Sequence, residues 1–109
     1  MFKIAKNRTF KRTVTVNLPT SEVDRVVEQK FVAEFRAMTR SDIEALQAQK
    51  LTDREFVGKI LVGVDGIGDE AGNPYPAEEA RQLVIEDIDV CAATIAAFNE
   101  QYVKAKSGN

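Results

Sequence analysis

The stretch FVGKILVGVDGIGDEAGNPYP, residues 56–76, decides how this chain of 109 residues is divided. Its first part carries apolar residues at helical spacing, which predicts an amphipathic helix with Phe56 and Ile60 on one stripe. Its second part is rich in glycine and acidic residues, which predicts a loop whose glycines take positive φ. Val64 and Ile67 are apolar within this loop, and we expect them to tuck under it as anchors, the alternative being exposed contacts. We also expect a hairpin and a short helix before this stretch, and two further helices after it.

Two segments before residue 40 alternate apolar and polar residues. Residues 10–18 and residues 27–36 both follow this period of two, and the first segment is rich in β-branched residues, which is typical of half-buried strands. The polar link between them begins with Pro19, and strands joined by so short a link pair antiparallel. Because a lone hairpin is marginally stable in water, we expect this one to pack on the helices or on a second copy of the chain.

Capping boxes predict where the two middle helices begin. Ser41 with Glu44 would start a short helix over residues 41–50. Thr52 with Glu55 would start the helix that leads into the glycine-rich loop. In each box the two side chains accept hydrogen bonds from backbone N–H groups that the first turn of a helix leaves free.

Two more helices are predicted after the loop. Pro76 suits the first turn of one helix, because its missing backbone donor is not needed there. Asp87 or Asp89 would cap the last helix, which we expect from residue 90 to about residue 103. One stripe of this helix is apolar and would face the core; it consists of Cys91, Ile95, Phe98 and Tyr102.

These elements predict an α+β fold, with an N-terminal antiparallel β-hairpin followed by about four α-helices, in a chain that is mostly helical. We expect a basic N-terminal arm over residues 1–9, a single domain over residues 10–103 and a flexible C-terminal tail over residues 104–109. Neither a membrane span nor a signal peptide is expected, since no long apolar run occurs. The single Cys91 agrees with a reducing compartment, so we expect a cytoplasmic protein.

Charge is unevenly distributed along the chain, although the net charge is only -2. Residues 1–12 carry five bases and no acid, whereas residues 65–89 carry eight acids against Arg81 alone. One interpretation is a solvated tail and a solvated loop. The other is two surfaces that favour different partners.

Few of the side chains needed for catalysis or metal binding are present. The chain has no histidine, the commonest general base and metal ligand, and Cys91 lies on an apolar helical stripe. An EF-hand calcium loop that starts at Asp65 would lack two of its oxygen ligands, because its third position is Ile67 and its twelfth is Pro76. We therefore predict no catalytic residue, no metal site and no cofactor, and a protein that is not an enzyme.

The order of these motifs resembles the tail assembly chaperones of long-tailed bacteriophages. The resemblance covers residues 10–103, through strands like RTVTVNLP and KFVAEFRAM, a capped helix like SDIEALQ, and the stretch ILVGVDGIGDEAGNPYP. Its most specific part is the run VGVDGIGDEAGNP, residues 62–74, in which Val64 stands where the family often has an aromatic residue.

The resemblance implies a non-enzymatic role in the cytoplasm of the host bacterium. Such chaperones bind the long helical tape measure protein, keep it soluble, help to recruit tail tube subunits, and are absent from the mature virion. The partners implied are the tape measure protein, the tail tube protein and further copies of the chain as a homo-oligomer. Neither a membrane nor nucleic acid is expected as a partner.

The residues expected to face the partner are Phe56, Ile60, Val64, Asp65, Gly66 and Ile67. Their apolar members would cover apolar stripes of a partner helix. For Phe56 and Ile60 the alternative is that both are ordinary core residues. Two other functions stay open: a small structural tail or connector protein of the virion, and a DNA-associated accessory protein that uses the basic N-terminal arm.

Overall fold

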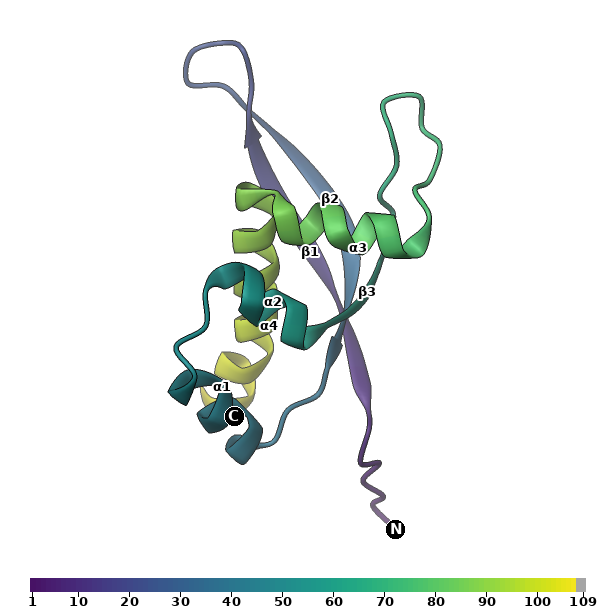
Figure 1. The fold of residues 1–109 in the computed structure, drawn as a ribbon. Coiled ribbons are helices and arrows are strands. Elements are labelled where there is room, and N and C mark those ends of the chain that lie inside the picture. The colour runs from purple at the N-terminus through teal and green to yellow at the C-terminus, as the bar shows by residue number, and fades with distance from the viewer. Residues whose placement is uncertain (108–109) are drawn as a thin grey trace.

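The structure is a computed structural model that describes residues 1–107, with side chains described for residues 1–102. One antiparallel sheet, in the order β1-β2-β3, forms a layer whose inner face is covered by helices (Figure 1). The strands are β1 (Thr9–Pro19), β2 (Val26–Arg36) and β3 (Leu61–Asp65). The helices are α1 (Arg40–Ala48), α2 (Asp53–Ile60), α3 (Ala77–Glu86) and α4 (Ile88–Ser107).

The predicted α+β class is confirmed, but the expectation of a mostly helical chain is wrong. The helices of the described residues hold less than half of the chain. The sheet also contains a third strand, β3, which the sequence analysis did not predict. This unpredicted strand lies within the stretch of residues 56–76.

The predicted N-terminal hairpin is confirmed. β1 and β2 pair antiparallel along their whole length, from Thr9 opposite Arg36 to Pro19 opposite Val26. The far end of this hairpin projects beyond the helices (Figure 1). Because side chains alternate across a strand, one face of the pair turns toward the helices and the other toward solvent. The buried side chains of the pair are Val14, Val16, Phe31, Ala33 and Phe35.

Residues 61–65 form a strand where a helix leading into a loop was expected. α2 ends at Ile60 and β3 begins at Leu61, so helix and strand meet without a connecting loop. β3 pairs antiparallel with β2, and Val64 lies opposite Ala33. An apolar run as short as ILVGV fits a helix or a strand, so its period could not distinguish them. Pairing with β2, a contact distant in sequence, decides in favour of the strand.

α1 begins at a different capping box from the predicted one. Oγ1 of Thr39 accepts a hydrogen bond from the backbone N–H of Asp42 at 3.1 Å, and Oδ2 of Asp42 accepts one from the N–H of Thr39 at 3.0 Å. Ser41 therefore already lies inside the helix. The chain offers two boxes of equal spacing, and the earlier one is used. The second predicted box, Thr52 with Glu55, is confirmed.

A cluster of aromatic rings joins the sheet to α4. The ring centroid of Phe98 lies 5.5 Å from that of Phe35, 5.7 Å from that of Phe56 and 5.1 Å from that of Tyr102. Phe10 of β1 also contacts Phe98, with its ring centroid at 6.1 Å. Aromatic pairs at such distances add roughly 0.5–1.5 kcal/mol each beyond the area that they bury. The predicted apolar stripe of the last helix is thus confirmed as the centre of the core.

The last two helices begin close to their predicted positions. α3 starts directly after Pro76, and Oδ1 of Asp87 accepts a hydrogen bond from the N–H of Val90 at 3.0 Å, which confirms Asp87 as the cap of α4. α4 continues to Ser107 and so passes the predicted end at residue 103. Residues 108–109 of the predicted tail lie outside the described residues. In the described part of the chain, no helix has both the length and the hydropathy to cross a bilayer.

Candidate functional site

The six residues expected to face a partner do not share one surface. Ile60 has no exposed surface at all and packs within the core, which was the alternative raised for it from the sequence. The other five line three separate hollows in the described part of the chain. Each hollow is built by a different combination of elements and differs in chemistry.

The first hollow lies between α1, α2 and α4, and we name it the helical hollow. It measures about 320 Å³. Phe56 forms part of its wall and is half-buried, because its ring also meets Phe98 edge-on. Further apolar wall comes from Leu46, Leu51 and Ile95, which are also half-buried. The residues around it are Leu46, Gln47, Lys50, Leu51, Asp53, Phe56, Ile95 and Asn99.

α1 covers one side of the helical hollow without being buried itself. None of its residues is buried, and its packing against the core is made by Leu46. The helix ends before Lys50, which takes a positive φ of 52°. A nine-residue helix held by so little buried apolar surface belongs to the least stable part of a fold. We therefore expect α1 to be the least stable wall of the hollow.

The glycine-rich loop is a short hairpin held by its own hydrogen bonds. Oδ1 of Asp69 accepts hydrogen bonds from the N–H groups of Ala71 and Asn73, both at 2.9 Å. Gly72 has the predicted positive φ, of 88°, but Gly63 and Gly68 do not take positive φ, so the prediction is wrong for these two glycines. A side chain at Gly68 would place its Cβ 2.8 Å from the carbonyl oxygen of Asn73. Glycine is thus needed at residue 68 for close approach and at residue 72 for backbone conformation.

The second hollow lies between this loop and the far half of the β1–β2 hairpin, and we name it the loop groove. Gly66, with a φ of 89°, turns the chain out of β3. Val64 and Ile67 are half-buried against the core, which confirms them as anchors, although Val64 lies in β3 rather than in the loop. The groove measures about 130 Å³ and is lined by Val16, Leu18, Gln29, Lys30, Phe31, Gly66, Ile67, Gly68 and Val90.

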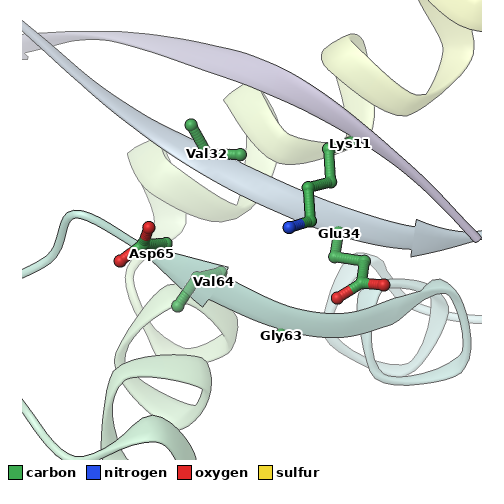
Figure 2. A pocket seen from close by; sticks show the side chains of 6 residues that line it. All are labelled: Lys11, Val32, Glu34, Gly63, Val64 and Asp65. Carbon is green, nitrogen blue, oxygen red and sulfur yellow. The ribbon is translucent and has the colours of Figure 1, made fainter.

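The third hollow, of about 150 Å³, lies on the outer face of the sheet (Figure 2). Val64 and Asp65 of β3 line it, together with Lys11 of β1 and Glu34 of β2. Figure 2 shows the amine of Lys11 reaching over β2 on the side of Glu34. Oγ1 of Thr9 donates a hydrogen bond to Oε2 of Glu34 at 2.6 Å. Charges of both signs on an uncovered face are typical of a solvated sheet surface.

Among the side chains that the structure describes, two have shifted pKa values, and the fold explains both. Hydrogen bonds from the backbone N–H and the hydroxyl of Thr52 hold the pKa of Glu55 below its ordinary value. Burial raises the pKa of the Cys91 thiol. Among the described residues, no three histidine, cysteine or acidic side chains are grouped so that they could hold a metal ion.

Comparisons with protein-family models, with curated proteins and with solved structures find no match. The three hollows are therefore weighed on their own chemistry. The helical hollow combines more space with four apolar side chains and a wall, α1, that has no buried residue. The loop groove has five apolar side chains, less space and acidic residues beside it in the chain. The outer-face hollow is mainly polar.

Sequence reasoning missed most of the helical hollow. Ile95 lies on the predicted apolar stripe of the last helix, but the approach of α1 and α4 to α2 depends on tertiary packing that periodicity does not report. Leu51 was not predicted to line a surface. A signal for it was present, because Leu51 directly precedes the capping Thr52 and Phe56 follows four residues after that cap. These are the two positions of a hydrophobic staple.

Proposed function

We propose that this chain is a non-enzymatic tail assembly chaperone of a long-tailed bacteriophage, which binds the helical tape measure protein in the host cytoplasm. The observation that carries the proposal is the helical hollow, whose apolar wall of Leu51, Phe56 and Ile95 is partly open to solvent. Helix-in-groove recognition uses such surfaces, since a partner helix lays apolar anchors spaced three or four residues apart into them. The resemblance of residues 10–103 to the chaperone family supports the same role.

The rim of the helical hollow suits a reversible contact. Gln47, Lys50, Asp53 and Asn99 surround the apolar wall with groups that are solvated when the hollow is empty. An apolar centre with a polar rim is the usual anatomy of a protein interface. A hollow of this size takes only one or two side chains of a partner helix at a time. Many copies acting along a long helix would therefore shield it with modest affinity for each copy.

A chaperone of this kind would act before the tail is complete. We expect it to hold the tape measure protein soluble while tail tube subunits assemble, and to be absent from the mature virion. Mass spectrometry of purified particles checks the second point. Abundant peptides of this chain in the particles would favour a structural tail or connector protein instead.

The proposal is tested by co-expression with a tape measure protein, the long helical partner that it names. We expect the wild-type chain to raise the soluble fraction of that protein and to co-purify with it. Asn99→Arg places a long charged side chain at the rim of the hollow and should abolish both effects. Ala45→Arg is the matched control, because Ala45 is an exposed helical residue outside the hollow. Equal activity of the two variants, or no effect of the wild-type chain, would refute this function.

A further inference from the structure

α1 is joined to the rest of the molecule by few contacts. None of its residues is buried, and its packing against the core is made by Leu46. The hydrogen bonds of α1 run between residues 39 and 50, and the ion pairs found between described side chains involve no residue of α1. α1 has 9 residues, and a helix shorter than about 12 residues is marginal in water without tertiary packing.

The two ends of α1 weaken it further. Its first residue, Arg40, places a positive charge at the positive end of the helix dipole. Lys50 follows the C-cap residue Gln49 and has a φ of 52°, in the left-handed region where glycine is favoured and a side chain is strained. Both features lower the stability of the helix in the conformation that it takes here.

The segment that carries α1 is fixed at both ends by contacts that do not involve α1. Before the helix, the N–H of Met38 donates a hydrogen bond to the hydroxyl oxygen of Tyr102 in α4 at 2.7 Å. After it, Thr52 forms the capping box of α2 with Glu55. These two fixed points enclose residues 39–51. Release of α1 from its place would therefore break neither contact.

The surface beside α1 is apolar and is built by the two neighbouring helices. Phe56 of α2 and Ile95 of α4 line the helical hollow together with Leu46 of α1. Figure 1 shows α1 beside the end of α4 that is nearest the C-terminus. Ile43 and Leu46 are both half-buried and lie three residues apart, so they share one face of α1. α1 thus covers this surface with apolar residues at the spacing that a partner helix would use.

We propose that an amphipathic helix of the partner displaces α1 and takes its place against α2 and α4. With α1 in place the hollow measures about 320 Å³, which is short for a helix that binds through several anchors along one face. Without α1, the apolar surface around Phe56 and Ile95 is open along its length. This inference rests on the proposed function, since the partner is the helical tape measure protein. Because α1 must be released first, its stability sets how tightly the partner binds.

Displacement predicts that loosening α1 strengthens binding. Thr39→Ala removes the cap of α1, so the Kd for a helical segment of the tape measure protein should fall about fivefold in isothermal titration calorimetry. Thr20→Ala is the matched control. Oγ1 of Thr20 accepts a hydrogen bond from the N–H of Glu22 at 3.2 Å, in the link between β1 and β2 at the other end of the body from α1 (Figure 1). This variant should leave the Kd unchanged, and loss of folding could not explain tighter binding by Thr39→Ala.

A more stable α1 should have the opposite effect. The double variant Arg40→Glu, Ser41→Ala replaces a base at the positive end of the helix by an acid and adds a better helix former, and both residues are exposed and lie outside the hollow. The Kd should rise about fivefold, measured at salt high enough to screen exposed charges. If α1 instead stays in place as a wall of the site, a firmer α1 should bind the segment equally well or more tightly.

Hydrogen exchange of the wild-type chain reports the state of α1 directly. In the chain alone, the amides of α1 should exchange faster than those of α2 and α4, through local opening. Saturation with the same helical segment should speed exchange in α1 further and slow it in α2 and α4.

Two results would overturn displacement and leave the chaperone proposal standing, because in both the segment still binds. One is slower exchange in α1 on binding, which would mean that α1 closes over the partner. The other is a Kd that Thr39→Ala does not lower, or that shifts in the same direction in both α1 variants. No binding of the segment by the wild-type chain would refute both proposals.

Discussion

Arg81 of α3 hydrogen-bonds to the backbone of Leu61, the residue at which α2 ends and β3 begins. Its Nε donates a hydrogen bond to the carbonyl oxygen of Leu61 at 3.1 Å, and its Nη2 donates one to the carbonyl oxygen of Gly58 at 2.9 Å. The last carbonyls of a helix have no partner within that helix. Arg81 therefore supplies, from α3, the donors that the end of α2 lacks.

Arg81→Met should destabilise the domain, because it removes both hydrogen bonds and keeps most of the apolar stem. We expect the free energy of unfolding to fall by about 1–3 kcal/mol, measured by urea denaturation. The control is Arg54→Met, which removes an exposed ion pair with Glu86 whose atoms are 2.8 Å apart. Such surface pairs contribute at most about 1 kcal/mol. Equal losses in the two variants would contradict the role assigned to Arg81.

Alanine should have opposite effects at two exposed glycines. Gly72 has a φ of 88°, and a side chain there is strained although the space around it is open. Gly72→Ala should therefore cost about 1–2 kcal/mol. Gly58 lies inside α2 with open space at its Cβ position, so Gly58→Ala should stabilise the protein by about 0.5–1 kcal/mol. Thermal unfolding of both variants checks the signs, and the same sign for both would be evidence against these backbone assignments.

The two capping boxes should differ in their effect on the whole domain. Thr52→Ala removes the cap of α2, which contains the buried Val57 and Ile60, and should lower the free energy of unfolding by about 1 kcal/mol. Thr39→Ala removes the cap of α1, which has no buried residue, so its main effect should be local. Hydrogen exchange would show this as faster exchange in α1 with little change in global stability. A larger global loss from Thr39→Ala would mean that α1 is not the weakly held wall inferred above.

Stability should fall in acid partly through Glu55. Its folded-state pKa lies below the value of 4.5 for an unperturbed glutamate, because Thr52 donates hydrogen bonds to its carboxylate. The ionised carboxylate therefore adds stability above pH 4.5, and that contribution is lost as the pH falls through the lower folded-state pKa. Glu55→Gln keeps an acceptor in the capping box but does not titrate. Urea midpoints measured from neutral pH downward should decline less steeply in this variant, and parallel curves would argue against the shift.

The sequence predicted those parts of the fold that depend on neighbouring residues. Alternation identified the hairpin, the box of Thr52 and Glu55 identified the start of α2, and the apolar stripe of α4 identified Phe98 as a core residue. The predictions that were wrong concern features that depend on contacts between segments distant in the sequence. β3 is a strand only because Ala33 and its neighbours on β2 lie beside it, and Ile60 shares its stripe with Phe56 but is turned wholly into the core.

The candidate site was harder to predict for the same reason. The glycine-rich run drew attention to residues 64–67, and the structure divides them between the outer sheet face and the loop groove. The helical hollow draws on Leu46, Leu51 and Ile95, which are distant in the sequence and come together only when α1 and α4 pack beside α2. Of the partner-facing residues predicted, Phe56 alone lies there.

The central claim is that the helical hollow receives an apolar helix of the partner. Amide chemical-shift mapping by NMR, during titration with a helical segment of the tape measure protein, tests it most directly. We predict that the largest shifts fall on α1, on Leu51 to Phe56 and around Ile95, and that Asn99→Arg abolishes them. Shifts confined to the outer sheet face around Lys11 and Glu34, or no shifts with a segment that co-purifies with the chain, would contradict the claim.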